Sequence, residues 1–337
     1  MNQSLIHGVM LTMIAGLMSG NCMLPMKFTR SWKWENVWLV FSVISLVILP
    51  WALAIVLVDH LLDTYRGLLI GQLVVPLLLG VGWGVAQILF GISVKRLGLG
   101  VAYAIIVGLG AVLGTLVPLF AQQDASAIRH AASFILGGVV IMVAGVFLTA
   151  WGGQVSEHRS TVVETLSRRQ GYPTAILIAI LCGIMAPMLN YSFAFGQDIA
   201  HEAVRLGNPA VRAAYAVWPI TLTGGFIPNV GFCIYLLSKN RTWSSFHPVG
   251  RDILWSSLMA VLWMGAFALY GMSAIYLGSF GTSIGWGLFQ IFMIMTATLS
   301  GVLIGEWKGA PRFATLLLGL GLTCLTGATV LLALGNR

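Results

Sequence analysis

Charged residues are scarce in this sequence. Only 8% of its 337 residues are charged, whereas a soluble globular domain carries roughly 25%. The 18 basic and 10 acidic residues are crowded into short segments between apolar runs of about 20 residues, the length that spans a bilayer. The sequence therefore predicts an all-α membrane protein that crosses the bilayer repeatedly. It excludes a soluble enzyme and a nucleic-acid binder, although the net charge is +8.

Motifs for catalysis and for cofactor binding are also missing. The chain has no ATP-binding loop, nucleophile elbow, His-Glu-x-x-His motif or dinucleotide fingerprint. Its four cysteines lie singly inside apolar runs, which argues against a disulfide framework and a zinc site. None of the acidic residues falls at the centre of a span, where a carboxylate is costly and usually functional. We expect no enzyme activity, no cofactor, no metal, and a site for a neutral or weakly charged solute.

Ten apolar runs are long enough to cross a bilayer. We predict these spans at residues 4–25, 36–58, 67–93, 98–121, 130–152, 173–196, 213–238, 253–276, 279–304 and 313–334. Alternate connections hold 13 and 5 of the Lys and Arg residues. Because basic residues concentrate in cytoplasmic loops, this bias predicts that both termini lie outside the cytoplasm and that the connection 153–172 is cytoplasmic. The opposite orientation stays open if one span is miscounted.

The two halves of the chain repeat each other. Trp38 and Trp218 are separated by 180 positions, and seven positions of the third span recur in the eighth at the same offset: Trp83, Leu89, Phe90, Gly91, Ser93, Leu97 and Gly98 match Trp263, Leu269, Tyr270, Gly271, Ser273, Leu277 and Gly278. This register indicates a duplicated five-helix unit. Repeats with an odd number of helices enter the membrane from opposite faces, which gives a 5+5 inverted repeat, typical of secondary carriers. We predict a first repeat at 1–152, a cytoplasmic linker at 153–172 and a second repeat at 173–337.

Amides and tryptophans inside the spans are the candidates for substrate binding. Sugars need hydrogen-bonding groups for their hydroxyls and aromatic rings for their C–H faces. The candidates are Asn21, Trp83, Gln87, Asn190, Trp218, Trp263, Trp286 and Gln290. Trp83 and Gln87 are one helical turn apart, as are Trp286 and Gln290. Asn21 precedes Pro25 and Asn190 follows Pro187, where a bent helix would expose backbone groups. The alternative roles are interhelical hydrogen bonds for the amides and an interfacial belt for tryptophans at span ends.

A proton-coupled carrier also needs a group that titrates. The candidates are Glu35, Glu306 and His7, all near the ends of spans. Histidine changes its charge near physiological pH. The alternatives are surface ion pairs for the two acids and an ordinary hydrogen-bonded histidine.

Several segments together resemble a known family. They are Trp32-Lys33-Trp34-Glu35 with Trp38, Leu49-Pro50-Trp51, Gly82 and Gln87 through Gly91 and Leu97-Gly98, Gly114-Thr115-Leu116, His201-Glu202-Ala203 with Leu206-Gly207, Gly224-Gly225 through Asn229 to Cys233, and Glu306-Trp307. Their order and spacing resemble the L-rhamnose-proton symporter family of the drug/metabolite transporter superfamily. The resemblance implies ten helices in a 5+5 inverted repeat. It also implies uptake of a deoxyhexose with a proton across the bacterial inner membrane.

We therefore expect a multi-pass carrier that takes up a neutral monosaccharide with a proton by alternating access, with L-rhamnose as the first choice. Two alternatives stay open. One is an exporter or exchanger of another metabolite, such as an amino acid or a nucleotide-sugar, because a fold does not determine its cargo. The other is a membrane receptor that binds a sugar without moving it. The expected partners are the sugar, the proton and the lipid bilayer, and a homodimer is left open.

Overall fold

All ten predicted spans are helical. The computed structural model describes residues 3–121, 125–157, 172–247 and 250–335, and no strand occurs among them. Ten of its helical segments are long and apolar enough to cross a membrane. The helices are α1 (Gln3–Asn21), η1 (Leu24–Phe28), α2 (Trp34–Val43), η2 (Ile44–Ile48), α3 (Leu49–Leu57), α4 (Leu61–Arg66), α5 (Ile70–Leu97), α6 (Leu99–Phe120), α7 (Ala125–Glu157), α8 (Tyr172–Met185), α9 (Met188–Phe195), α10 (Gln197–Arg205), α11 (Ala210–Ala213), η3 (Ala214–Ala216), α12 (Val217–Asn240), η4 (Trp243–Phe246), α13 (Asp252–Tyr276), η5 (Gly278–Phe280), α14 (Gly281–Leu303) and α15 (Arg312–Leu334).

Prolines interrupt three of the spans. α1 ends at Asn21, and Pro25 begins a separate turn in η1. In the sixth span α8 ends at Met185, and α9 starts only after Pro187. Both interruptions confirm the bends expected at these prolines. The second span contains a π-helical turn, η2, directly before Pro50. Proline has no N–H to donate, and its ring clashes with a carbonyl of the preceding turn in regular α-helical geometry.

Two connections differ from the prediction. α5 continues through Lys95 and Arg96 to Leu97, so the turn into α6 is reduced to Gly98, whose φ of 83° favours glycine. The connection 197–212 contains the short amphipathic helix α10, which buries Ile199 and Ala203. Hydropathy missed this helix because its apolar face is narrow. Most of the connection 153–172 lies outside the described residues.

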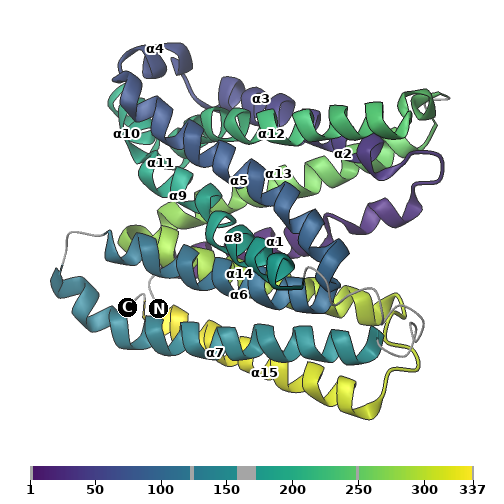
Figure 1. Ribbon diagram of the computed structural model, residues 1–337. Coiled ribbons are helices and arrows are strands. Elements are labelled where there is room, and N and C mark those ends of the chain that lie inside the picture. Colours follow the sequence, from purple (N-terminus) through teal and green to yellow (C-terminus); the bar gives the residue numbers. More distant parts are fainter. Residues whose placement is uncertain (1–2, 122–124, 158–171, 248–249, 336–337) are drawn as a thin grey trace.

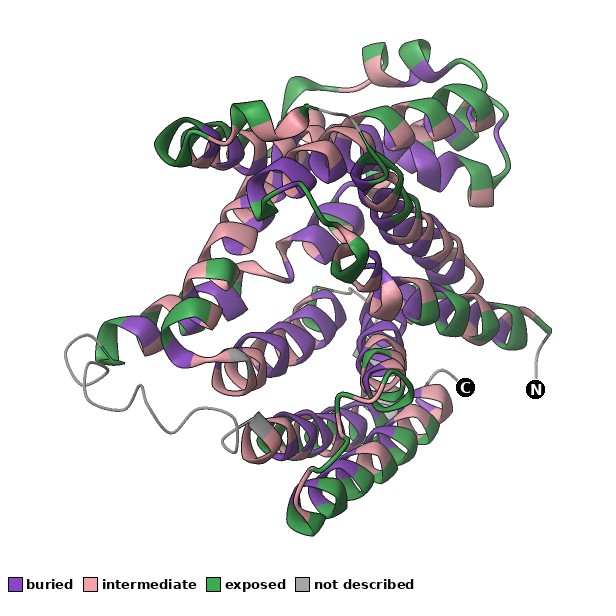
Figure 2. Cartoon of the chain, turned by 90° about the vertical axis from the view of Figure 1, so that its right-hand side faces the viewer, coloured by how far each residue is buried: buried purple, intermediate pink, exposed green. Residues whose placement is uncertain are grey.

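The helices pack as a bundle around α13, which is the most enclosed of the ten spans. α7 and α15 lie side by side along one edge, and α12 with α2 and α3 forms the opposite edge (Figure 1). α5 packs on α12 where Gly84 lies against Gly225, so close that a Cβ on Gly84 would be 2.5 Å from the Gly225 carbonyl oxygen. Exposed residues cover the outer faces (Figure 2), and many are apolar, such as Val56 and Leu303. This distribution suits a lipid environment.

The two ends of the bundle differ in charge. The first, which we call the basic end, holds η1, the start of α13 and the connection between α14 and α15, with Lys27, Arg30, Arg251 and Lys308. The opposite end, which we call the far end, holds α4, α10 and the start of α12. α1 begins and α15 ends at the far end (Figure 1).

Asp252 stabilises the backbone at the basic end, and its removal should destabilise the fold. Its carboxylate is 4% exposed and accepts the backbone N–H groups of Arg30 at 3.0 Å, Ser31 at 2.7 Å and Trp32 at 2.8 Å. We expect Asp252→Ala to lower the free energy of unfolding by about 2–4 kcal/mol, because three donors lose a charged acceptor. A thermal melt of the purified protein measures this loss. Asp198→Ala, which removes one bond from Gln72 at an exposed site, is the control and should change the melt little.

Candidate functional site

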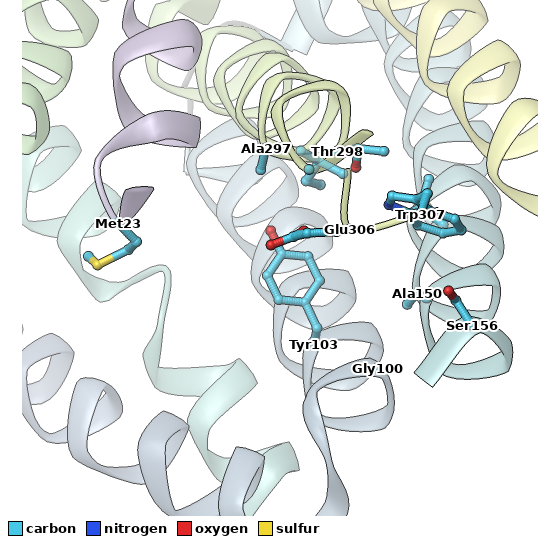
Figure 3. Close-up of a pocket in the computed structure, with 13 residues that line it drawn as sticks. Met23, Gly100, Tyr103, Ala150, Ser156, Ala297, Thr298, Glu306 and Trp307 are labelled. Carbon is cyan, nitrogen blue, oxygen red and sulfur yellow. The ribbon is translucent and has the colours of Figure 1, made fainter. Parts of the chain in front are cut away.

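A cavity opens among the helix ends at the basic end of the bundle. Its volume is about 630 Å³, within the range of roughly 300–1,000 Å³ that is usual for small-molecule sites. The lining comes from the last residues of the first span, the start of α6, the end of α7, the second half of α14 and the connection to α15 (Figure 3). Its polar lining residues are Tyr103, Thr149, Ser156, Thr298, Glu306 and Trp307. Hydroxyls dominate this set, with a single carboxylate.

Helical spacing explains which residues reach this basic-end cavity. Gly100 and Tyr103 of α6 are three positions apart, and Ile294, Thr298 and Gly301 of α14 lie on successive turns. Each set therefore occupies one face of its helix. Gly100 and Gly301 let neighbouring groups approach closely, because a Cβ would be 2.9 Å from the Gln154 Cβ and 2.6 Å from the Glu306 carboxylate, respectively. Gly153 has open space around it.

Glu306 is the predicted proton-coupling residue that lines the cavity. Its carboxylate forms an ion pair with Lys27 of η1, and both side chains are half-exposed. Glu306 and Tyr103 both project into the same space (Figure 3). Glu306 is open to solvent, lies beside the cavity and pairs with a base from another span. Its protonation would therefore break a contact between helices.

The other two proton-coupling candidates lie elsewhere. Glu35 is 6% exposed and accepts hydrogen bonds from Asn240 at 3.0 Å and Thr242 at 2.7 Å, which ties the start of α2 to the end of α12. His7 packs against Tyr276 near the far end, with 5.9 Å between ring centroids. Neither residue is among those that line the basic-end cavity.

Two predicted tryptophans from different halves of the chain meet in the structure. Trp83 of α5 and Trp263 of α13 stack with 5.4 Å between ring centroids and an interplanar angle of 26°. Phe267 packs against Trp263 at 4.5 Å, so the pair belongs to a larger aromatic group. Two residues that match at the offset of 180 positions are thus in contact within the hydrophobic core.

Two predicted glutamines have amides that are free to bind a ligand. The side chains of Gln87 and Gln290 make no hydrogen bond within the described part of the chain. Their polar atoms are nevertheless not completely buried. Gln87 is partly exposed, whereas Gln290 is 7% exposed and therefore buried. Gln290 lies one turn from Ile294, a cavity residue, on the same face of α14. Gln87 lies one turn from Trp83 on α5.

The remaining predicted binding residues are occupied by protein contacts. Asn190 donates to the carbonyls of Gly114 and Thr282, both at 2.9 Å. Asn21 donates to the Leu17 carbonyl at 3.0 Å and accepts from Ser300 at 2.6 Å. The other two are Trp286, whose indole N–H donates to the Gly110 carbonyl at 3.1 Å, and Trp218, which is 1% exposed and stacks on Phe193. The contacts of Asn190 and Asn21 match the alternative stated for amides in the spans. The indole N–H of Trp218 is buried without a hydrogen-bond partner among the described residues.

The cavity and the predicted binding residues coincide only in part. None of the eight predicted residues is among the residues that line the basic-end cavity, although Gln290 continues one of its walls. Sequence reasoning missed Tyr103, Thr149 and Thr298 as lining residues. A glycine close to a polar residue at the same end of several spans, as in Gly100 with Tyr103, is the signal that would have found them.

Comparisons with known proteins identify the family. The sequence model of the family described as "L-rhamnose-proton symport protein (RhaT)" matches residues 1–336. Similar proteins named L-rhamnose-proton symporter occur in Klebsiella pneumoniae (strain 342), with 26% identity, and in Escherichia coli (strain 55989 / EAEC), with 24% identity. One from Cronobacter sakazakii is 26% identical, and all three alignments cover 99% of both chains. Because the family model matches nearly the whole chain, this protein belongs to the L-rhamnose-proton symport protein family, a family of membrane transporters and not of enzymes.

Proposed function

We propose that this protein takes up L-rhamnose together with a proton by alternating access in the bacterial inner membrane. The observation that carries the proposal is the family match over residues 1–336, together with relatives named for this cargo that align over 99% of both chains. A neutral deoxyhexose also suits the spans, whose acids all lie near span ends. Hydroxyls and one carboxylate around a cavity of about 630 Å³ are compatible with a small polar cargo.

We also infer a 5+5 inverted repeat with repeats at 1–152 and 173–337 joined by a cytoplasmic linker. The helix contacts support it, because exchanging each span with the one five places later reproduces them. α1 packs on α13 and α14, and correspondingly α8 packs on α5 and α6. α6 packs on α7 as α14 packs on α15. Such a duplication provides two related routes to one central site.

In this proposal Gln87 and Gln290 bind sugar hydroxyls, and Trp83 with Trp263 forms an apolar wall. Asn21, Asn190, Trp218 and Trp286 hold the surrounding helices in place. Glu306 carries the proton, since it lines the cavity and Glu35 and His7 do not. Protonation of Glu306 removes its charge and so releases Lys27, which loosens the contact between η1 and the connection from α14 to α15. Proton binding is thereby linked to helix movement at the mouth of the cavity.

The charge bias supports an orientation with the basic end in the cytoplasm and both termini in the periplasm. The basic-end cavity then faces inward. The conformation corresponds to the step at which the sugar and the proton leave for the cytoplasm.

Counterflow in proteoliposomes tests the cargo. Vesicles loaded with unlabelled L-rhamnose should accumulate external labelled L-rhamnose transiently, whereas vesicles loaded with an amino acid or a nucleotide-sugar should not. A carrier for another metabolite would show counterflow only with that metabolite. A receptor would bind labelled L-rhamnose in detergent but give no counterflow, and either outcome would overturn the proposal.

A further inference from the structure

The far end contains a closed counterpart of the basic-end cavity. The 180-position offset relates the cavity residue Tyr103 to Ser283, and Ile294 to Gly114. At the far end each of these two residues is hydrogen-bonded to a neighbouring span. Ser283 donates to the Thr115 carbonyl at 2.7 Å, and Asn190 donates to the Gly114 carbonyl at 2.9 Å. The seam between α6 and α14 is therefore open at the basic end and bonded shut at the far end.

Asn190 is the centre of this closure. Its amide nitrogen uses both hydrogens, one for Gly114 of α6 and one for Thr282 at the start of α14. Its amide oxygen accepts the hydroxyl of Tyr270 from α13. Asn190 and Tyr270 are both fully buried. One side chain on the short helix α9 thus joins three other spans, and it does so directly after the break at Pro187.

A second, independent feature of this seam is a buried hydroxyl that lacks a partner, as expected if the seam separates in another conformation. The hydroxyl of Thr115 is completely buried and has no hydrogen-bond partner among the described residues. It lies on the same seam, 3.2 Å from where a Cβ on Gly287 would be. A buried hydroxyl without a partner is costly, and each case needs an explanation. A seam that fills with water in another conformation supplies the missing partner.

We propose that Tyr270 and Asn190 form a latch that keeps the far-end seam between α6 and α14 closed while the basic-end cavity is open. The latch releases when the cavity closes, and the released seam admits solute from the far end. This inference rests on the proposed alternating access, but it does not depend on the identity of the cargo. Asn190 and Tyr270 are then positioning residues that set the balance between two conformations.

Thiol labelling at Thr115 tests the latch. Thr115→Cys is introduced after the native residues Cys22, Cys182, Cys233 and Cys324 are replaced by serine or alanine. The Thr115 hydroxyl makes no bond, so the substitution removes no hydrogen bond. The purified protein in detergent is treated with a charged, water-soluble methanethiosulfonate, which reaches both ends. Labelling should be slow in this parent and about five-fold faster with Tyr270→Phe, the factor expected for one lost hydrogen bond.

Matched variants separate the latch from general loosening. Tyr65→Phe is the control, because the Tyr65 hydroxyl also donates to a far-end carbonyl, that of Ala216 at 2.8 Å, but between α4 and η3. It should leave labelling unchanged. Asn190→Ser serves as a second latch variant if Tyr270→Phe does not fold, and it should also speed labelling. The latch proposal would be overturned if the latch variants were labelled at the same rate as the parent. It would also be overturned if Tyr65→Phe raised the labelling rate as much as Tyr270→Phe does.

L-Rhamnose counterflow by the parent protein distinguishes failure of the latch from failure of the cargo assignment. Faster labelling in the latch variants without L-rhamnose counterflow in the parent would support a gate in a carrier for another solute. Normal counterflow in the parent with unchanged labelling in the variants would reject the latch and retain L-rhamnose as the cargo.

Discussion

Replacing Glu306 by glutamine should abolish accumulation of L-rhamnose driven by a proton gradient, while exchange of labelled for unlabelled sugar continues. Glutamine keeps the shape of the side chain at the cavity mouth, but it cannot take up a proton or carry the charge that pairs with Lys27. If one proton moves with each sugar, an inward gradient of one pH unit sustains about ten-fold accumulation. The Glu306→Gln protein should therefore fall to no accumulation, measured as the ratio of internal to external sugar in proteoliposomes.

Glu202→Gln is the matched control for this prediction. Glu202 also pairs with a base, Arg205, but at the far end and away from the cavity. This variant should accumulate sugar as the parent does. Gradient-driven accumulation by Glu306→Gln at the parental level would show that Glu306 does not carry the proton, and Glu35→Gln and His7→Gln would be measured next.

Substituting methionine for Gln87 or Gln290 should raise the KM for L-rhamnose about ten-fold while leaving thermal stability unchanged. Neither amide has a hydrogen-bond partner within the described residues, so methionine, which is similar in length, removes no hydrogen bond within the protein. In the complex each amide would bind a sugar hydroxyl, and a ten-fold loss equals about 1.4 kcal/mol, within the cost of leaving one partner unpaired. Initial uptake rates at increasing sugar concentration measure the KM.

Asn229→Leu should have the opposite effect to the glutamine variants, because it should reduce stability and not sugar binding. The Asn229 amide donates to the Gly225 carbonyl at 2.9 Å and accepts from Trp38 at 3.0 Å. Its loss should lower the melting temperature and leave the KM near that of the parent. A pair of glutamine variants that lower the melting temperature without changing the KM would assign those amides to packing instead of binding.

Hydropathy and internal repetition were sufficient to predict where the helices lie along the sequence. Apolar runs predicted all ten spans, and prolines predicted the breaks after α1 and α8. The offset of 180 positions paired Trp83 with Trp263, and the structure stacks them. Each of these features is encoded by spacing along the chain.

The site could not be predicted to the same depth, because it depends on which faces of distant helices meet. Asn190 and Gln290 are both span amides, yet only Asn190 finds carbonyl partners, and these are 76 and 92 positions away. Glu35 and Glu306 both lie near Lys and Trp in the sequence, yet Glu35 is bonded to Asn240 and Thr242 and Glu306 lines the cavity. Sequence alone offers no measure of such lateral contacts.

The most direct test of proton-coupled sugar uptake is transport of labelled L-rhamnose into proteoliposomes that contain the purified protein, with and without an imposed inward proton gradient. We expect accumulation above the external concentration only with the gradient, with competition by unlabelled L-rhamnose but not by glucose. Equilibration to the external concentration with or without the gradient would contradict proton coupling. Uptake no greater than in empty liposomes would contradict L-rhamnose transport itself.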